Sequence, residues 1–468
     1  MRVHCAKIAS YLPRDLPVLS LSGGTMLTRS SLLIAVLAVQ SCMFGDVKKQ
    51  QEIIATYCVL EGEVSAERRD PVPLIVVLVQ QTQANQQLRK SWRVADHFVV
   101  DVAGHWRFRT AAGTYGLVAF QDIHPDLKHQ IDEPYLRLET GSVVTCVAGE
   151  PHSGLVLNVP ADGRPRSDEP LDLASVQARS VDDQLLVTLG SVTAFGDIVT
   201  LADARFAAAV AEDGLWRPFD FLFKGRPGIY FLEPYDSRKI PVLFVHGIGG
   251  SPAGFASLIG RLDRGRFQPW VYYYPSGGAL DAIADHLTQT FRTLQVKHGF
   301  DSFAVVAHSM GGLVSRGFLL RYAESRGHAE SPLFVSISTP WGGHKAAELG
   351  VRMAPAVVKV WVDMAPDSAY QRALFYKDPE ARTSPRELPP GTSHHLLFTF
   401  RQDSLNLGEA SDGSVTVASQ LRWEAQHEAR RLYGINETHT GVLESEETST
   451  LINDVLTQAF SPAPEPAS

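Results

Sequence analysis

The stretch Phe303-Ala-Val-Val-Ala-His-Ser-Met-Gly-Gly-Leu-Val-Ser-Arg316 joins an apolar run to a cluster of small residues around one serine. It predicts a buried strand, a sharp turn at 307–311 and a helix from about Gly312. In such a nucleophile elbow the strained turn lifts a serine hydroxyl, here that of Ser309, into a crevice above a sheet. Small residues flank the serine because the backbone approaches itself closely there. The alternative is a serine that only caps a helix.

The chain as a whole has the composition of a globular protein. Its 468 residues are 44% hydrophobic and 20% charged, with a formal net charge of -8. This length leaves room for about two or three domains and a large core. The mild charge and the lack of a dense Lys/Arg stripe in the sequence argue against a nucleic-acid partner.

The N-terminal segment predicts export. A basic start at Met26-Leu-Thr-Arg29 precedes the apolar run 30–39, and Gln40-Ser-Cys42 follows it. This order is typical of a secretory signal, and an apolar core of about ten residues is too short to span a bilayer as a helix. We therefore expect residues 1–41 to be a signal peptide whose true start is Met26.

Cys42 stands where a bacterial lipobox has the cysteine that becomes the lipidated first residue. This resemblance implies an exported protein that is anchored in the bacterial cell envelope, with the membrane as a partner. Met43 rather than an aspartate follows the cysteine, which favours the outer membrane of a Gram-negative host. The alternative is a signal peptide cleaved elsewhere, with Cys42 incidental.

Residues 42–150 predict a small all-β sandwich that precedes the rest of the chain as an accessory domain. Short β-rich runs alternate with turns that contain Gly104, Gly113 and Gly141. The expected strands are 57–64, 74–79, 97–102, 106–108, 115–120 and 142–147. The histidines of this segment, His105, His124 and His129, fit surface or turn positions better than a metal site, and we expect no metal.

Two cysteines, Cys58 and Cys146, lie within the predicted sandwich. An oxidising compartment outside the cytoplasm allows them to form a disulfide. The sequence does not reveal their separation in space, so two buried thiols are an equal alternative.

A second domain is expected after a linker. Residues 151–189 are rich in Pro, Asp, Ser and Gly, which is typical of a linker. Over 190–460 apolar strands alternate with helical segments, which predicts a mostly parallel α/β sheet with helices on both faces. The expected strands are 229–232, 241–245, 270–273, 303–307, 333–338 and 395–400, and the expected helices are 252–263, 279–298, 312–325 and 446–459. The tail 461–468 is expected to be disordered.

A glycine-rich turn, His246-Gly-Ile-Gly-Gly250, follows the apolar strand 241–245. Dinucleotide binding would require glycine where Pro252 stands, so that alternative fails. The turn predicts instead an oxyanion loop, whose backbone amides point at a reacting carbonyl group. The expected donors are the amides of Ile248 and Met310.

A nucleophilic serine needs a base, and the base needs an acid that holds its tautomer, in the chain order serine, acid, histidine. Asp412, before Gly413 in a turn, is the expected acid; the alternatives are that it only caps backbone amides, or that Asp403 is the acid. His439 lies in a loop ahead of the last helix and is the expected base. His427 lies in a charged run and is expected to be solvated.

Five motifs in this order resemble bacterial α/β-hydrolase lipases and GPI inositol-deacylase-like esterases. They are His246-Gly-Ile-Gly-Gly250, Ala307-His-Ser-Met-Gly-Gly312, Ser338-Thr-Pro-Trp-Gly-Gly343, Ser411-Asp-Gly413 and His439-Thr-Gly441. The resemblance covers roughly 240–445, under half the chain. It implies an α/β-hydrolase fold in which Ser309, Asp412 and His439 are nucleophile, acid and base, and no cofactor is expected. A calcium site known in some such lipases is not expected, because Gly441 and Val442 follow the histidine.

The substrate pocket is expected beside the elbow. Its predicted residues are His246, Gly247, His308 and Trp341, the last of which either lines the pocket or simply packs. The insertion 342–394 is expected to form a cap. Its apolar stretch 346–364 predicts a lid over the pocket, or else a core helix.

Three functional hypotheses follow from these residues. The leading one is an exported serine hydrolase that cleaves carboxylic esters, with lipid esters as the expected substrates. The second is an acyltransferase that uses the same site and passes the acyl group to an alcohol or amine. The third is a catalytically silent surface lipoprotein whose β-domain binds an unidentified partner, and the intact set of catalytic groups argues against it.

Overall fold

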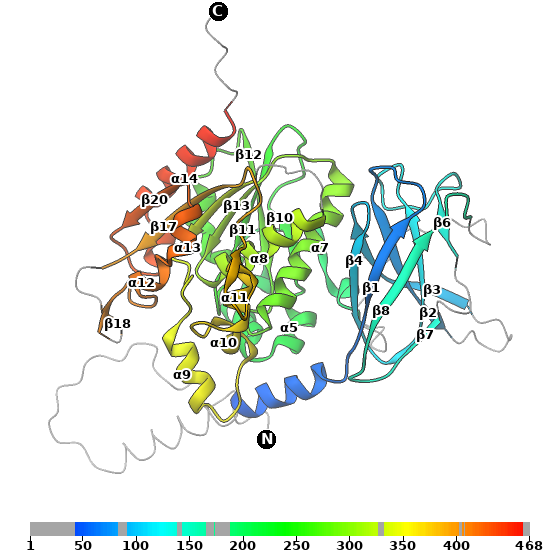
Figure 1. The fold of residues 1–468 in the computed structure, drawn as a ribbon. Coiled ribbons are helices and arrows are strands. Elements are labelled where there is room, and N and C mark those ends of the chain that lie inside the picture. Colours follow the sequence, from blue (N-terminus) through cyan, green and yellow to red (C-terminus); the bar gives the residue numbers. More distant parts are fainter. Residues whose placement is uncertain are drawn as a thin grey trace, which may run out of the picture.

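The computed structural model describes residues 43–82, 91–137, 143–164, 173, 188–325, 332–401, 405–406 and 408–461. A β-sandwich and a larger α/β region lie side by side (Figure 1). The expected signal peptide, Cys42, Asp403 and all of the tail after Ser461 fall outside the described residues. No helix in the described ranges is long and apolar enough to cross a membrane.

The β-sandwich consists of two sheets that share one core. The first has the order β4-β1-β8, made of β1 (Cys58–Ala66), β4 (Gly104–Thr110) and β8 (Pro151–Val159). The second has the order β3-β2-β5-β6, with β7 paired to β5, made of β2 (Leu74–Thr82), β3 (Ser91–Val100), β5 (Gly113–Gln121), β6 (Tyr135–Leu136) and β7 (Val143–Cys146). Leu60 and Trp106 of the first sheet are buried in one cluster with Val76 and Leu117 of the second. This is the packing of a sandwich, with one buried face on each sheet.

The boundaries of the sandwich differ from the predicted ones at both ends. Residues 43–54 form a helix that packs on the α/β region, where Val47 joins the core. At the other end, the prediction of a linker was wrong for 151–159, because this segment is β8 and pairs in parallel with β1. The sequence did not reveal this strand because the apolar alternation that buries Leu157 and Val159 is short. The Pro-rich sequence directly after it gave the whole segment 151–189 the composition of a linker.

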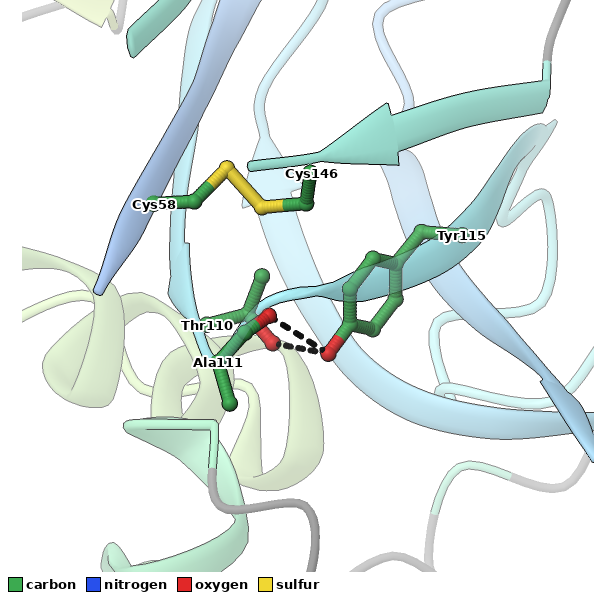
Figure 2. Close-up of a disulfide and its surroundings, with 5 residues drawn as sticks. All are labelled: Cys58, Thr110, Ala111, Tyr115 and Cys146. Carbon is green, nitrogen blue, oxygen red and sulfur yellow. Dashed lines mark hydrogen bonds between the residues drawn. A yellow bond between two sulfur atoms is a disulfide. The ribbon is translucent and has the colours of Figure 1, made fainter. Parts of the chain in front are cut away.

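Cys58 and Cys146 form a disulfide between β1 and β7, with their Cα atoms 5.9 Å apart (Figure 2). Beside it, the Tyr115 hydroxyl accepts a 2.7 Å hydrogen bond from Thr110 Oγ1 and donates one of 3.0 Å to the Ala111 carbonyl oxygen. Of the two states that the sequence left open, the structure has the disulfide. The cross-linked residues are 88 positions apart in the sequence, so the bond restricts the unfolded chain strongly.

An eight-stranded sheet of order β20-β17-β14-β13-β11-β12-β10-β9 forms the centre of the α/β region. Its strands are β9 (Ala194–Ile198), β10 (Gly228–Phe231), β11 (Ile240–Val245), β12 (Phe267–Tyr273), β13 (Ala304–His308), β14 (Leu333–Ile337), β17 (Ser393–Thr399) and β20 (Arg431–Ile435). All neighbours are parallel except β10 and β12. The sequence missed only the two edge strands, β9 and β20. Edge strands face water and lack a continuous apolar run, as the exposed Arg431 and Leu432 of β20 illustrate.

Helices cover both faces of this sheet (Figure 1). α7 (Leu280–His298) and α8 (Met310–Ser325) bury their apolar sides in one cluster, whereas α6 (Ala256–Gly260) and α14 (Glu446–Ala459) belong to another. The other short elements are η2 (Gly190–Val192), η3 (Ala204–Phe206), α4 (Ala208–Trp216), α5 (Pro218–Lys224), η4 (Pro252–Phe255), β18 (Leu405–Asn406), β19 (Glu409–Ala410), α12 (Val417–Gln420), α13 (Trp423–Glu428) and η5 (Gly441–Leu443). A mostly parallel sheet between two helical layers, with a sharp strand-to-helix turn after β13, is the α/β-hydrolase fold, so the predicted fold class is confirmed.

The chain between β14 and β17 forms the insertion that was expected as a cap. It contains α9 (Lys345–Met353), α10 (Lys359–Met364), α11 (Ala369–Phe375) and a hairpin of β15 (Tyr376–Asp378) and β16 (Thr383–Pro385). The apolar stretch 346–364 is split between two helices. α10 buries Val360 and Met364 in the core, while α9 leaves Leu349 and Met353 exposed. The stretch therefore packs at one end and faces solvent at the other.

The sandwich meets the α/β region along α7. The Val99 amide on β3 donates a 3.2 Å hydrogen bond to Gln289 Oε1, and Arg107 on β4 donates one of 3.0 Å to Asp285 Oδ2. The Gln289 side chain thus satisfies one amide on the open edge of β3, and the Asp285 side chain pairs with Arg107 of β4. A cavity of about 780 Å³ lies between the two regions, and His97 is among its lining residues.

Candidate active site

Ser309 stands at the sharp turn between β13 and α8. Its φ is 55°, in the left-handed region that a non-glycine residue rarely adopts. The turn is held by a 2.8 Å hydrogen bond from the Ser309 amide to the Ile337 carbonyl oxygen of β14. A side chain at Gly311 would lie 2.3 Å from the Val245 carbonyl oxygen, and one at Gly312 would lie 2.0 Å from Thr339 Oγ1. The two glycines are therefore needed for α8 to start this close to β11 and β14.

Three side chains that are far apart in the sequence meet at this turn. Ser309 Oγ lies 2.9 Å from His439 Nε2, and His439 Nδ1 lies 2.8 Å from Asp412 Oδ2. The Asp412 side chain is completely buried and that of His439 is 14% exposed. The hydroxyl, the imidazole and the carboxylate are thus connected in series by short contacts, and the imidazole in the middle is partly exposed to solvent.

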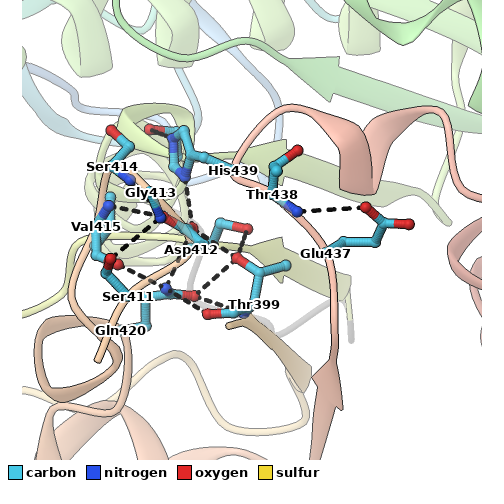
Figure 3. Close-up of polar contacts among 12 residues, drawn as sticks. Thr399, Ser411, Asp412, Gly413, Ser414, Val415, Gln420, Glu437, Thr438 and His439 are labelled. Atoms are coloured by element: carbon cyan, nitrogen blue, oxygen red, sulfur yellow. Dashed lines mark hydrogen bonds and ion pairs between the residues drawn. The ribbon is translucent and has the colours of Figure 1, made fainter. Parts of the chain in front are cut away.

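Asp412 is held by a dense set of donors (Figure 3). Its Oδ1 accepts hydrogen bonds from the amides of Ser414 (2.9 Å) and Val415 (2.8 Å). Its Oδ2 accepts from Thr399 Oγ1 (2.6 Å) and Gln420 Nε2 (3.3 Å). Burial raises the pKa of this carboxyl, but His439 and the hydrogen-bond donors outweigh that effect and hold the pKa below its ordinary value. The group is therefore a carboxylate at neutral pH.

Asp412 thus caps backbone amides and contacts the histidine at the same time, so the two roles that the sequence left as alternatives coexist. Asp403, the other candidate acid, lies outside the described residues. His427 is exposed on α13, where its ring packs against Trp423 at 4.4 Å between centroids.

The loop that carries His439 is tied to the acid and to the elbow. The His439 amide donates a 3.0 Å hydrogen bond to the Asp412 carbonyl oxygen. His308, next to the serine, has its Nε2 2.7 Å from the His439 carbonyl oxygen, and its ring lies 4.7 Å from that of His439. Burial, and then the neighbouring His439, lower the pKa of His308 to about 3. The ring is therefore neutral at pH 7 and donates from Nε2, which positions the base without adding charge beside it.

The glycine-rich loop 246–250 passes directly against the serine. A side chain at Gly247 would lie 2.8 Å from Ser309 Cβ and 3.3 Å from its Oγ. The Gly249 amide donates a 3.0 Å hydrogen bond to Ser276 Oγ, and Gly249 has a φ of 64°. The amide of Ile248 lies between these two fixed points, and the amide of Met310 begins α8, where N–H groups have no partner within the helix. The Ile248 amide is thus part of the loop that contacts Ser309, and the Met310 amide directly follows Ser309 in the chain.

His246 and Trp341, predicted to line the pocket, are both buried. The His246 ring stacks on that of Tyr274, with 4.2 Å between ring centroids, and its Nδ1 lies 2.8 Å from the Gly247 carbonyl oxygen. His246 therefore supports the glycine-rich loop and does not line a pocket. Burial lowers its pKa to about 4. Trp341 is fully buried against Phe334 and Phe375, which favours the packing alternative for this residue.

Sequence reasoning missed the two side chains that hold the acid. Thr399 ends β17, and Gln420 ends α12, where its Oε1 accepts a 2.8 Å hydrogen bond from the Thr399 amide. A polar residue at the carboxyl end of a buried strand, as Thr399 is, was a signal for the first of them. Gln420 had no such signal, because its position depends on how α12 folds back over the strand.

The described residues contain no group of three or more His, Cys, Asp or Glu placed to hold a metal ion. In the sandwich, His124 Nε2 lies 3.1 Å from Asp132, His105 Nε2 lies 3.5 Å from Glu63, and His129 packs between Phe120 and Tyr135. Each of these three histidines, which the sequence did not assign to a metal site, thus contacts a neighbouring side chain.

No protein-family model and no curated protein matches the chain. Solved structures do. The mature lipase BlEst2 of Bacillus licheniformis is 15% identical, over 49% of this chain and 97% of that one, with a TM-score of 0.37. Lipase B of Aspergillus fumigatus is 15% identical, over 49% of this chain and 55% of that one, with a TM-score of 0.35. Naproxen esterase of Bacillus subtilis is 14% identical, over 50% and 87%, with a TM-score of 0.30.

These likenesses cover about half of this chain. What the site can do follows from its own geometry. An imidazole between a carboxylate and a hydroxyl can take the hydroxyl proton while the carboxylate stabilises the resulting charge. Backbone amides beside the hydroxyl can stabilise a negative oxygen that forms there.

Proposed function

We propose that this chain is a serine hydrolase of carboxylic esters, in which Ser309 is the nucleophile, His439 the base and Asp412 the acid. The observation that carries the proposal is the unbroken line of contacts at 2.9 Å and 2.8 Å through the two ring nitrogens of His439. The carboxylate fixes the proton of the imidazole on Nδ1, which leaves the lone pair of Nε2 facing the serine hydroxyl.

In the first half of the reaction Ser309 Oγ attacks the ester carbonyl carbon and its proton passes to His439 Nε2. The carbonyl oxygen becomes an oxyanion, which the amides of Ile248 and Met310 stabilise. The intermediate then collapses, the bond to the alcohol oxygen breaks, and the alcohol leaves with the proton from His439. The product is an acyl group on Ser309.

In the second half water replaces the alcohol. His439 takes a proton from the water, the hydroxide oxygen attacks the acyl carbon, and the same two amides stabilise the second oxyanion. Collapse releases the carboxylic acid and returns the proton to Ser309 Oγ. An acyltransferase would differ only in this half, because an alcohol or amine would attack in place of water.

We extend the proposal to lipid esters and to an exported, lipid-anchored protein. Two features support this extension: the signal-like segment that ends at Cys42, and a cap whose helix α9 exposes apolar side chains. A disulfide between Cys58 and Cys146 is in keeping with folding outside the cytoplasm.

The test is turnover of a panel of esters with increasing acyl length by the parent protein and by Ser309→Ala. We expect the substitution to lower kcat/KM by roughly four to six orders of magnitude without a change in the unfolding transition. The matched control is Ser315→Ala, because Ser315 is a buried serine on α8, the helix that follows Ser309, and its hydroxyl has no partner among the described residues. Esters cleaved equally fast by Ser309→Ala would refute the proposal, and acyl transfer to an added alcohol in place of hydrolysis would favour the transferase.

A further inference from the structure

Helix α9 presents an apolar stripe to solvent. Ala346, Leu349 and Met353 lie at spacings of three and four residues, which places them on one face of the helix, and all three are exposed. Leu349 is 52% exposed and Met353 is 75% exposed. Arg352 lies beside the stripe and is exposed as well. An amphipathic helix of this composition is typical of segments that lie in a membrane interface.

The helix over residues 43–54 connects the start of the described chain to this part of the cap. Phe44 packs edge-on against Trp216, with ring centroids 6.3 Å apart, and Trp216 packs in the same way against Trp361 of α10 at 5.8 Å. The Trp361 ring in turn lies so close to Gly350 of α9 that a Cβ there would come within 2.9 Å of it. A continuous series of packed rings therefore runs from residue 44 to α9.

Polar contacts hold the same helix in place along the α/β region. Gln51 Nε2 donates a 2.7 Å hydrogen bond to the Val357 carbonyl oxygen, between α9 and α10. Gln50 Oε1 accepts hydrogen bonds of 2.9 Å and 3.0 Å from the amides of Phe219 and Asp220, at the start of α5. Lys48 and Lys49 of this helix are exposed. In Figure 1 this helix, drawn in blue, and α9 lie together at the lower edge of the molecule.

We propose that α9 and the start of helix 43–54 form one surface that lies on a lipid bilayer. The inference rests on the proposed lipid anchor, since Cys42 directly precedes the helix. An anchor at Cys42 would enter the bilayer one residue before a helix that is packed against the cap, so the same bilayer would meet the apolar stripe of α9. An anchor alone leaves the orientation of a protein free, whereas a second apolar contact fixes it.

The position of Cys42 directly before helix 43–54 favours a bilayer over a second protein chain at this surface. The exposed charges are mixed, with Lys48, Lys49 and Arg352 beside Glu52 and Glu348, so the apolar stripe rather than net charge would carry the contact. Insertion of Leu349 and Met353 would remove the two most exposed apolar side chains of the cap from water. A bilayer therefore accounts for the exposed stripe.

The test measures how deep the cap lies in vesicles of phosphatidylethanolamine and phosphatidylglycerol. In the mature lipidated chain Cys58 and Cys146 are bonded and Cys42 is acylated, so a nitroxide attaches to Met353→Cys alone. The matched control is Ile131→Cys on the sandwich, since Ile131 is 76% exposed and Met353 is 75% exposed. We expect the ratio of oxygen access to access of a water-soluble nickel complex to be high for the label at 353 and low for the label at 131. Equal access of the nickel complex to both labels would overturn the inference.

A second measurement separates this inference from the proposed function. The depth is read equally well in the Ser309→Ala background, so it does not depend on catalysis. The double variant Leu349→Ser with Met353→Ser should lower turnover of an ester embedded in vesicles by roughly tenfold and leave that of a soluble short-chain ester unchanged. Unchanged turnover in vesicles, or a dimer of the parent protein that the double variant dissociates, would overturn the membrane surface.

Discussion

The Thr399 hydroxyl donates a 2.6 Å hydrogen bond to Asp412 Oδ2, the same oxygen that lies 2.8 Å from His439 Nδ1. Thr399 is the last residue of β17, so the central sheet itself fixes the carboxylate that holds the histidine. Ser338, at the end of the neighbouring strand, lies 2.7 Å from the Thr399 hydroxyl and extends the same network. The Asp412 carboxylate is thereby held both by the central sheet, through Thr399, and by the amides of its own loop.

Thr399→Val tests this relationship, because valine keeps the shape of threonine and removes the donor. We expect kcat/KM to fall by about tenfold, mainly through kcat, since a buried carboxylate loses one of its hydrogen bonds. The pKa of Asp412 should rise toward its ordinary value, because one of the hydrogen bonds that lowers it is lost. The control is Thr392→Val, whose hydroxyl has no partner among the described residues. A kcat for Thr399→Val equal to that of the parent would contradict the assignment.

Gly247→Ala tests how closely the oxyanion loop approaches the nucleophile. The new methyl group would lie 2.8 Å from Ser309 Cβ, so the loop or the serine must move. Displacing an oxyanion donor costs about 10²–10³ in turnover, and we expect a loss of that size. Gly254→Ala is the matched control, because a Cβ there meets nothing within 4 Å. If the two variants turned over an ester at the same rate, the loop would not lie where we describe it.

The stability of the protein should depend on pH through its buried histidines. His394 stacks on Phe334, and burial, followed by the charge of Arg316, lowers its pKa to about 3. The unfolded chain takes up a proton below about pH 6.5, whereas the folded chain does so only near pH 3, so the free energy of unfolding falls as the pH falls through that window. His394→Gln should reduce this slope by up to about 1.4 kcal/mol per pH unit, as measured by urea unfolding at several pH values. The exposed His427→Gln is the control, and an unchanged slope in His394→Gln would contradict the neutral state of His394.

The disulfide of the sandwich should contribute to stability without affecting the active site. Replacing Cys58 and Cys146 by serine is expected to lower the free energy of unfolding by about 2–5 kcal/mol, because the bond closes a long loop. Denaturant titrations with and without reductant measure this difference. Reductant should shift the parent and leave the double variant unchanged. Turnover of a soluble ester should be the same for both proteins, since the bond lies in the other region of the molecule.

Much of this architecture was predictable because its interior is encoded by continuous apolar runs. The strands β11, β13 and β14 are buried on both faces, and each is a continuous run of mostly apolar residues in the sequence. Ser309, Asp412 and His439, which the structure brings together, could be selected from the sequence because each follows a predicted strand or precedes a helix in a fixed chain order.

The features that sequence reasoning missed depend on the tertiary structure. The edge strand β20 faces water along most of its length, so it carries no apolar signal. The helix over residues 43–54 was assigned to the sandwich because it precedes it in the chain, yet its buried Val47 packs in the other region. Gln420 reaches Asp412 only because α12 folds back on β17.

The most direct test of the central claim is the site of covalent labelling by a fluorophosphonate, identified by peptide mass mapping of the intact protein. Such a probe requires a serine activated by a base. We predict a single adduct, on Ser309, that is lost in Ser309→Ala and slowed by several orders of magnitude in His439→Ala. An adduct on another serine, or labelling of Ser309 that is as fast without His439, would contradict the account.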